Sequence, residues 1–147
     1  VFWSETIAFA KADSPYVTWQ DLNVDGVSVG ATQASSWSDI ARSKISNAEL
    51  KEFAGGTAQT VQALVSGRID GGVSDKATIA GFLTSIDGLK VLEGEISREP
   101  LGFAVRPDSL HLLAALDNYM GLIRADGRLD EKLEYWWNST AWEADHK

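Results

Sequence analysis

Two groups of polar side chains stand where an apolar segment gives way to an expected helix, and their chemistry is complementary. Asp75 follows the short apolar segment "GGVS", and Ser35 and Ser36 come soon after the segment "VSVGA". Hydroxyls and unpaired backbone N–H groups at a helix start can bind a carboxylate, because the helix dipole adds to the free donors. A carboxylate such as that of Asp75 can bind an ammonium group.

Donors for a carboxylate and an acid for an amine are together what a free amino acid needs. The same residues also have a purely structural explanation, because serine and aspartate are among the commonest N-caps of helices. The spacing alone leaves both explanations open.

Strands and helices alternate along most of the chain, which predicts an α/β fold with a mostly parallel sheet flanked by helices, followed by C-terminal helices. The expected strands are 6–10, 27–31, 48–55, 68–74, 89–94 and 101–106. The expected helices are a single turn at 18–22, then 34–45, 57–66, one that Asp75 opens, one from Pro107 to Gly127, and a last one beyond it. In open α/β sheets, ligands bind outside the carboxyl ends of the strands, which is where both polar groups fall.

Composition excludes several classes of site and partner. The 147 residues suffice for one domain with a core, and a net charge of −8 argues against nucleic acid as a partner. The chain has no cysteine, and its two histidines, His111 and His146, stand far apart. We therefore expect neither a metal site nor a histidine-based catalytic triad, and no other cofactor. No apolar run approaches the length of a membrane span.

Four segments carry a resemblance to a known family. They are "VGATQASSW" (29–37), "LVSGRIDGGVSD" (64–75), "LGFAVRPDS" (101–109) and "LIRADGRLDEKLEYWW" (122–137). In this order they resemble the polar amino-acid-binding proteins of ABC transporters, the solute-binding family 3 with the type II periplasmic binding fold. The resemblance implies that residues 6–100 form the second, ligand-closing lobe. Residues 101–147 would be the returning strand and the helices that normally belong to the first lobe, most of which would be absent.

The resemblance also assigns a role to each candidate residue. Ser35 and Ser36 match the hydroxyl pair that holds the ligand carboxylate, and Trp37 matches a position that often adds a contact. Asp75 matches the acid that pairs with the α-amino group of the ligand.

Two further features concern the backbone. Arg68 and Asp70 match a turn of the family motif, and we expect Asp70 to hold the tight turn between helix and strand. Ala34 replaces the glycine of the family's carboxylate-binding turn, which restricts the backbone there.

The leading hypothesis is a solute-binding module for an amino acid or a similar small zwitterion or carboxylate, part of ABC-type uptake. Its partner would be an ABC permease, and its location periplasmic or extracellular. One alternative is a ligand-sensing or dimerising regulatory domain of the same fold, and another is an interaction protein that has lost ligand binding. An enzyme is disfavoured, because Glu5, Asp75 and Glu99, the acids near the expected cleft, show no sign of acting as a pair.

The C-terminal tryptophans, Trp136, Trp137 and Trp142, have two explanations. They could pack that end of the chain onto the core, since tryptophan is a large apolar side chain. Alternatively they mark a surface covered by more protein, either a second copy in a homodimer or the missing first lobe.

Overall fold

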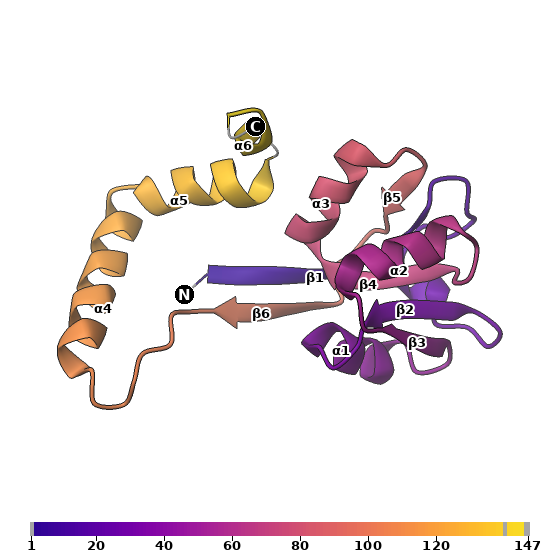
Figure 1. Cartoon of the computed structure of the whole chain (residues 1–147), viewed down its shortest axis with the longest axis horizontal. Coiled ribbons are helices and arrows are strands. Elements are labelled where there is room, and N and C mark those ends of the chain that lie inside the picture. The colour runs from indigo at the N-terminus through magenta and orange to yellow at the C-terminus, as the bar shows by residue number, and fades with distance from the viewer. Residues whose placement is uncertain (1, 140, 146–147) are drawn as a thin grey trace. The chain divides into compact units, whose positions relative to one another are not determined.

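The computed structural model in Figure 1 describes residues 2–139 and 141–145. The chain divides into two compact units, one over Phe2–Pro100 and one over the residues from Leu101 onward. The strands are β1 (Phe2–Lys11), β2 (Ser28–Thr32), β3 (Glu49–Phe53), β4 (Gly71–Asp75), β5 (Leu89–Val91) and β6 (Ser97–Leu101). The helices of the first unit are the 3₁₀ turn η1 (Trp19–Leu22), α1 (Ser36–Lys44), α2 (Gly56–Val65) and α3 (Lys76–Ser85).

The sheet has the strand order β3-β2-β4-β1-β5, and β6 pairs with β1. Strands β3, β2 and β4 run parallel, whereas β1 runs antiparallel to both β4 and β5. Strand β5 therefore runs in the same direction as β4, and β1 is the exception among these five. The predicted α/β class with a mostly parallel sheet is confirmed.

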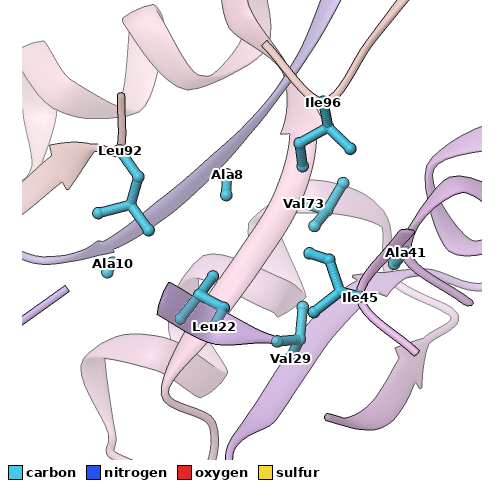
Figure 2. Packing of buried hydrophobic residues seen from close by; sticks show 9 residues of the cluster. All are labelled: Ala8, Ala10, Leu22, Val29, Ala41, Ile45, Val73, Leu92 and Ile96. Atoms are coloured by element: carbon cyan, nitrogen blue, oxygen red, sulfur yellow. The ribbon is translucent and has the colours of Figure 1, made fainter. Parts of the chain in front are cut away.

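Two apolar clusters fill the two faces of this sheet. On one face, Val29 and Val73 of the sheet pack against Ala41 of α1 and Ile45 just beyond it, as Figure 2 shows. The cluster also contains Ala8, Ala10, Leu22, Leu92 and Ile96. Helices α1 and α2 lie on opposite sides of β2 (Figure 1).

On the other face, Ile7 and Phe9 of β1 pack against residues of α2 and α3. Phe9 requires the glycine opposite it, because a Cβ built on Gly72 would lie 2.3 Å from the Phe9 Cζ atom. The alternation of side chains along β1 thus assigns Phe9 to one cluster and its neighbours Ala8 and Ala10 to the other.

Several element boundaries differ from the sequence-based expectations. The returning strand was expected at 101–106, but β6 covers Ser97–Leu101, and residues 102–106 belong to no strand. The physical reason is that a strand needs a backbone partner, and β6 finds that partner in β1. Pro107 does not start the next helix: Ser109 N–H donates to the Arg106 carbonyl in a turn, and helix α4 starts at Leu110.

The second unit is helical, with α4 (Leu110–Ala125), α5 (Arg128–Leu133), the π-helical turn η2 (Glu134–Asn138) and α6 (Ala141–Asp145). Gly127, with a φ of 84°, separates α4 from α5, as the sequence predicts. The expected single last helix is interrupted by the π-turn. The centroid of the Trp136 ring, in η2, lies 4.9 Å from that of Tyr135 in an edge-on contact and 6.0 Å from that of Trp142 in α6. Among the described residues, no helix is both long and apolar enough to cross a membrane.

Candidate functional site

The start of α1 is a serine cap that follows directly from the end of β2. The Ser35 hydroxyl accepts the N–H of Ser38 at 3.3 Å and donates to the Thr32 carbonyl at 2.6 Å. Ser35 is therefore the N-cap, one of the two expected residues, and its hydroxyl is used within the cap. The backbone N–H groups of Ser36 and Trp37 lie in the first turn of α1, where a helix offers no intrahelical acceptor, and groups of this kind can bind an anion.

Ala34 lies just before this cap in the left-handed region, with a φ of 54°. It is the one described residue other than glycine with a positive φ. The β-carbon makes this conformation costly, by about 1 kcal/mol or more, whereas glycine adopts it freely. The loop therefore holds Ala34 in a backbone conformation that glycine adopts more readily.

Ser36 and Trp37 point to different surroundings. The exposed Ser36 hydroxyl donates to Glu99 Oε2 of β6 at 3.1 Å. The Trp37 ring is half-buried and packs against the apolar cluster that contains Val29 and Val73. Trp37 thus has a structural role in the core, which leaves part of its ring exposed.

Asp75 ends β4 and caps α3. Its Oδ1 accepts the N–H of Thr78 at 2.8 Å, and its Oδ2 accepts the Thr78 hydroxyl at 2.6 Å. The residue is only 7% exposed, and Asp75 is paired in the sheet with Thr6 of β1. The capping role is therefore present in full, and each carboxylate oxygen still has a second lone pair that can accept a further donor.

The two helix starts lie at the same edge of the sheet. Strands β2 and β4 are parallel neighbours, with Val29 opposite Gly71 and Gly30 opposite Gly72. Because both strands run the same way, Thr32 and Asp75 end them at the same edge, and α1 and α3 begin there. The structure thus brings Ser35, Ser36 and Asp75 to one edge, with donors on one strand and an acid on the next.

Three further polar side chains lie near this edge, and of these the sequence did not single out Ser97. The hydroxyls of Thr32 and Ser97 are buried without a hydrogen-bond partner in the described structure, and Glu99 binds Ser36. Thr32 stands in the turn singled out from the sequence. Glu99 was named from the sequence as an acid near the expected cleft, but its contact with Ser36, like the position of Ser97, had no local signal, because β6 reaches the site only through sheet pairing.

The acids considered for catalysis each have a separate partner. Glu5 pairs with Lys76 at 2.8 Å and with Arg98 at 3.6 Å, and Arg98 also binds Glu95 at 2.8 Å. The hydrogen bond to Glu95 is the main cause that raises the pKa of Arg98. Glu99 binds Ser36 and Asp75 binds Thr78, so no hydrogen bond joins two of these acids in the described structure.

Asp70 acts differently from the expectation. Its Oδ2 accepts the backbone N–H of Ser28 at 2.8 Å and the Ser28 hydroxyl at 2.9 Å. It therefore ties the start of β4 to the start of β2, rather than holding the turn between α2 and β4. Arg68 lies over the Phe53 ring, 5.9 Å from its centroid.

No group of three or more histidine, cysteine, aspartate or glutamate side chains in the described part of the chain could hold a metal ion. His111 is exposed on α4, and His146 lies outside the described residues.

Comparisons with known proteins find one curated relative and several similar solved structures. No family model matches the chain. A 78-residue stretch is 36% identical to the ABC transporter arginine-binding protein 1 of Escherichia coli (strain K12), and covers 50% of this chain and 32% of that protein. The crystal structure of the ancestral amino acid-binding protein AncCDT-1, a precursor of cyclohexadienyl dehydratase, superposes with a TM-score of 0.76 and 26% identity, over 92% of this chain and 59% of the other.

The chain is a structural relative of the amino-acid-binding proteins of ABC transporters. The putative binding component of an ABC transporter from Wolinella succinogenes, solved with lysine, has the same fold, with a TM-score of 0.83 at 23% identity over 97% of this chain and 63% of that one. The resemblance stated from the sequence is confirmed. The chain spans about a third of the length of the curated relative and about three fifths of the two solved structures.

Proposed function

We propose that this chain contributes half of a binding site for a free amino acid or a similar small zwitterion. The observation that supports this most directly is that hydrogen-bond donors follow the end of β2, whereas a carboxylate stands at the end of the neighbouring strand β4. The first turn of α1 offers the backbone N–H groups of Ser36 and Trp37 with the Ser36 hydroxyl, which suit a carboxylate. Asp75, one strand away, offers a carboxylate to the α-ammonium group.

The relatives support this proposal through what their names say they bind. One is an arginine-binding protein, and one structure was solved with lysine. We infer that the Phe2–Pro100 unit, which contains the predicted lobe 6–100, closes on the ligand. Residues 101–147 would belong with a first lobe, which would supply the remaining contacts. Uptake through an ABC permease, from the periplasm or the extracellular space, follows as part of the same proposal.

Binding is preferred over catalysis because of how the acids are engaged. General acid–base chemistry needs a titratable group free to reach the substrate. Glu5 is held by Lys76 and Arg98, and Glu99 by Ser36. The ancestral neighbour described as a precursor of a dehydratase shows that this fold also lies close to an enzyme, so turnover belongs among the outcomes to be checked.

A thermal-shift screen against the common amino acids tests the proposal. A ligand that binds only the native state at a hundredfold excess over its Kd adds about 2.7 kcal/mol, which raises Tm by several degrees. We expect a shift with at least one amino acid in the wild-type chain. We expect little or none in Asp75→Asn, which keeps an N-cap side chain while it removes the charge. An equal shift in both chains would contradict the proposed role of Asp75.

A second candidate function is a ligand-sensing domain that acts through dimerisation. Helix α4 favours it, because Leu110 is 68% exposed and Leu122 is 58% exposed on the same helix. Exposed apolar surface of this kind is typical of a face that another protein covers. Sedimentation velocity tests this candidate: a monomer at all concentrations, with or without amino acid, would remove it.

A further inference from the structure

A carboxylate of the protein itself is hydrogen-bonded to Ser36 at the start of α1. Glu99, the third residue of β6, accepts the Ser36 hydroxyl at 3.1 Å through Oε2. The two residues are 63 positions apart in the sequence, so the contact depends on the fold. Ser36 is one of the two residues, with Ser35, that the family resemblance assigns to the ligand carboxylate. The first turn of α1 therefore already receives a carboxylate, and this one belongs to the protein.

Glu99 differs from the neighbouring Arg98 in how its charge is partnered within the described residues. Successive side chains of a strand point to opposite faces, so Arg98 and Glu99 diverge along β6. Arg98 binds Glu95 and Glu5, whereas no lysine or arginine in the described part of the chain forms an ion pair with Glu99. The Ser36 hydroxyl donates to the Glu99 carboxylate, and because Ser36 is the first residue of α1, this carboxylate lies near the positive end of the helix dipole.

We propose that Glu99 is a specificity-determining residue, a built-in carboxylate that competes for the ligand's carboxylate position and selects ligands by charge. This inference rests on the proposed function of the same site. One Ser36 hydroxyl donates a single proton, so a ligand carboxylate must displace Glu99 or share the site with it. Two carboxylates at such a distance repel each other. The positive side chain of a cationic amino acid is attracted to Glu99, which offsets part of this repulsion. The second carboxylate of a dicarboxylic amino acid is repelled by Glu99 as well.

A pair of matched variants tests this selection. Glu99→Gln keeps the shape and can still accept from Ser36, but it removes the charge. Glu95→Gln removes a charge near the same strand, on a side chain bound to Arg98 rather than to Ser36. Each chain is titrated with arginine, glutamine and glutamate, and the Kd is read from the backbone amide NMR signals of residues 35–37 and 75–78. The same spectra report whether each variant is folded.

We expect Glu99→Gln to tighten glutamate binding by roughly tenfold, glutamine binding by less, and arginine binding least, as partial screening of a short-range charge repulsion predicts. The arginine-to-glutamate preference therefore falls by roughly tenfold in Glu99→Gln. It changes by less than about twofold in Glu95→Gln, whose charge is neutralised by Arg98.

The outcomes separate the two proposals. If the wild type binds and the arginine-to-glutamate preference is the same in Glu99→Gln, the selective role of Glu99 is wrong and the proposed function stands. The same conclusion follows if Glu95→Gln changes the preference as much as Glu99→Gln does. If these amides respond to none of the three amino acids in any chain, the proposed function is wrong, and the inference falls with it.

Discussion

Asp75 binds Thr78 twice, through the backbone N–H at 2.8 Å and through the hydroxyl at 2.6 Å. This bidentate cap fixes the carboxylate at the end of β4, so it is oriented before any ligand arrives. A group held in this way loses little side-chain entropy on binding, which favours affinity. The structural explanation and the functional explanation of Asp75 are therefore compatible, and both were open from the sequence.

Substitution separates the two roles of Asp75. We expect Asp75→Ala to lower the free energy of unfolding by about 1 kcal/mol, because the cap is lost. Asp75→Asn should cost only a few tenths of that, since asparagine is an equally good N-cap, yet it should weaken amino-acid binding by about tenfold or more. Urea denaturation and ligand titration measure the two effects. Equal loss of stability in both variants would show that the cap needs the charge.

Ala34→Gly should stabilise the protein. With a φ of 54°, alanine pays a steric cost that glycine does not, and this outweighs the extra entropy of glycine in the unfolded chain. We expect a gain of up to about 1 kcal/mol in the free energy of unfolding. Ala12→Gly is the matched control, in a turn where the alanine φ is not positive, and it should be neutral or destabilising. A loss of stability in Ala34→Gly would contradict the strained loop.

Gly72→Ala should be among the most damaging small substitutions in the sheet. Its β-carbon would lie 2.3 Å from the Phe9 ring, and both residues are buried. We expect a loss of about 1–3 kcal/mol, the usual cost of overpacking a core. The double variant with Phe9→Leu should lose less than the sum of the single variants, because the smaller side chain leaves room for the methyl group. Simple additivity in chemical denaturation would show that the two residues do not compete for this space.

Acid pH should weaken the loop before η1 through Asp21. The backbone N–H of Thr18, and then that of Val17, bind Oδ2 at 2.8 Å each and lower the pKa of Asp21. Because the folded pKa lies below the unfolded value, this stabilisation is fully present above about pH 3.9 and is lost as the pH falls through the lower folded pKa. Asp21→Asn should therefore reduce stability at neutral pH and flatten its decline in acid.

The exposed Asp25, in the next loop, provides the control for this pH dependence. Thermal unfolding between neutral pH and pH 2 is measured in parallel in Asp25→Asn, which removes the same charge from an exposed loop. An unchanged acid limb in Asp21→Asn would contradict the assignment of this titration to Asp21.

The sequence predicts best what depends on neighbouring residues. The caps at Ser35 and Asp75 are hydrogen bonds between residues three positions apart, so residue type and position are enough to predict them. The same holds for the end of helix α4 near Gly127, which needs only a glycine in the left-handed conformation. For Ala34, the departure from glycine indicated a restricted backbone, and the structure shows which restriction it is.

What depends on distant pairing was not predictable. The last strand was placed at 101–106 from its apolar residues, yet pairing with β1 selects Ser97–Leu101, a polar stretch with a proline in it. Glu99 therefore stood outside every expected strand, and its contact with Ser36 had no signal in either segment. Asp70 was read as a local turn residue, whereas its partner is Ser28, 42 positions earlier.

The most direct measurement is an amide NMR titration with arginine and two analogues that each lack one recognised group. Agmatine has no carboxylate, and Nα-acetylarginine has no α-ammonium group. We predict that arginine shifts the signals of residues 35–37 and 75–78 together, that agmatine loses the response at 35–37, and that acetylarginine loses it at 75–78. Responses confined to other residues, such as those around Lys11 and Tyr16, or identical responses to all three compounds, would contradict a site that recognises both ends of an amino acid.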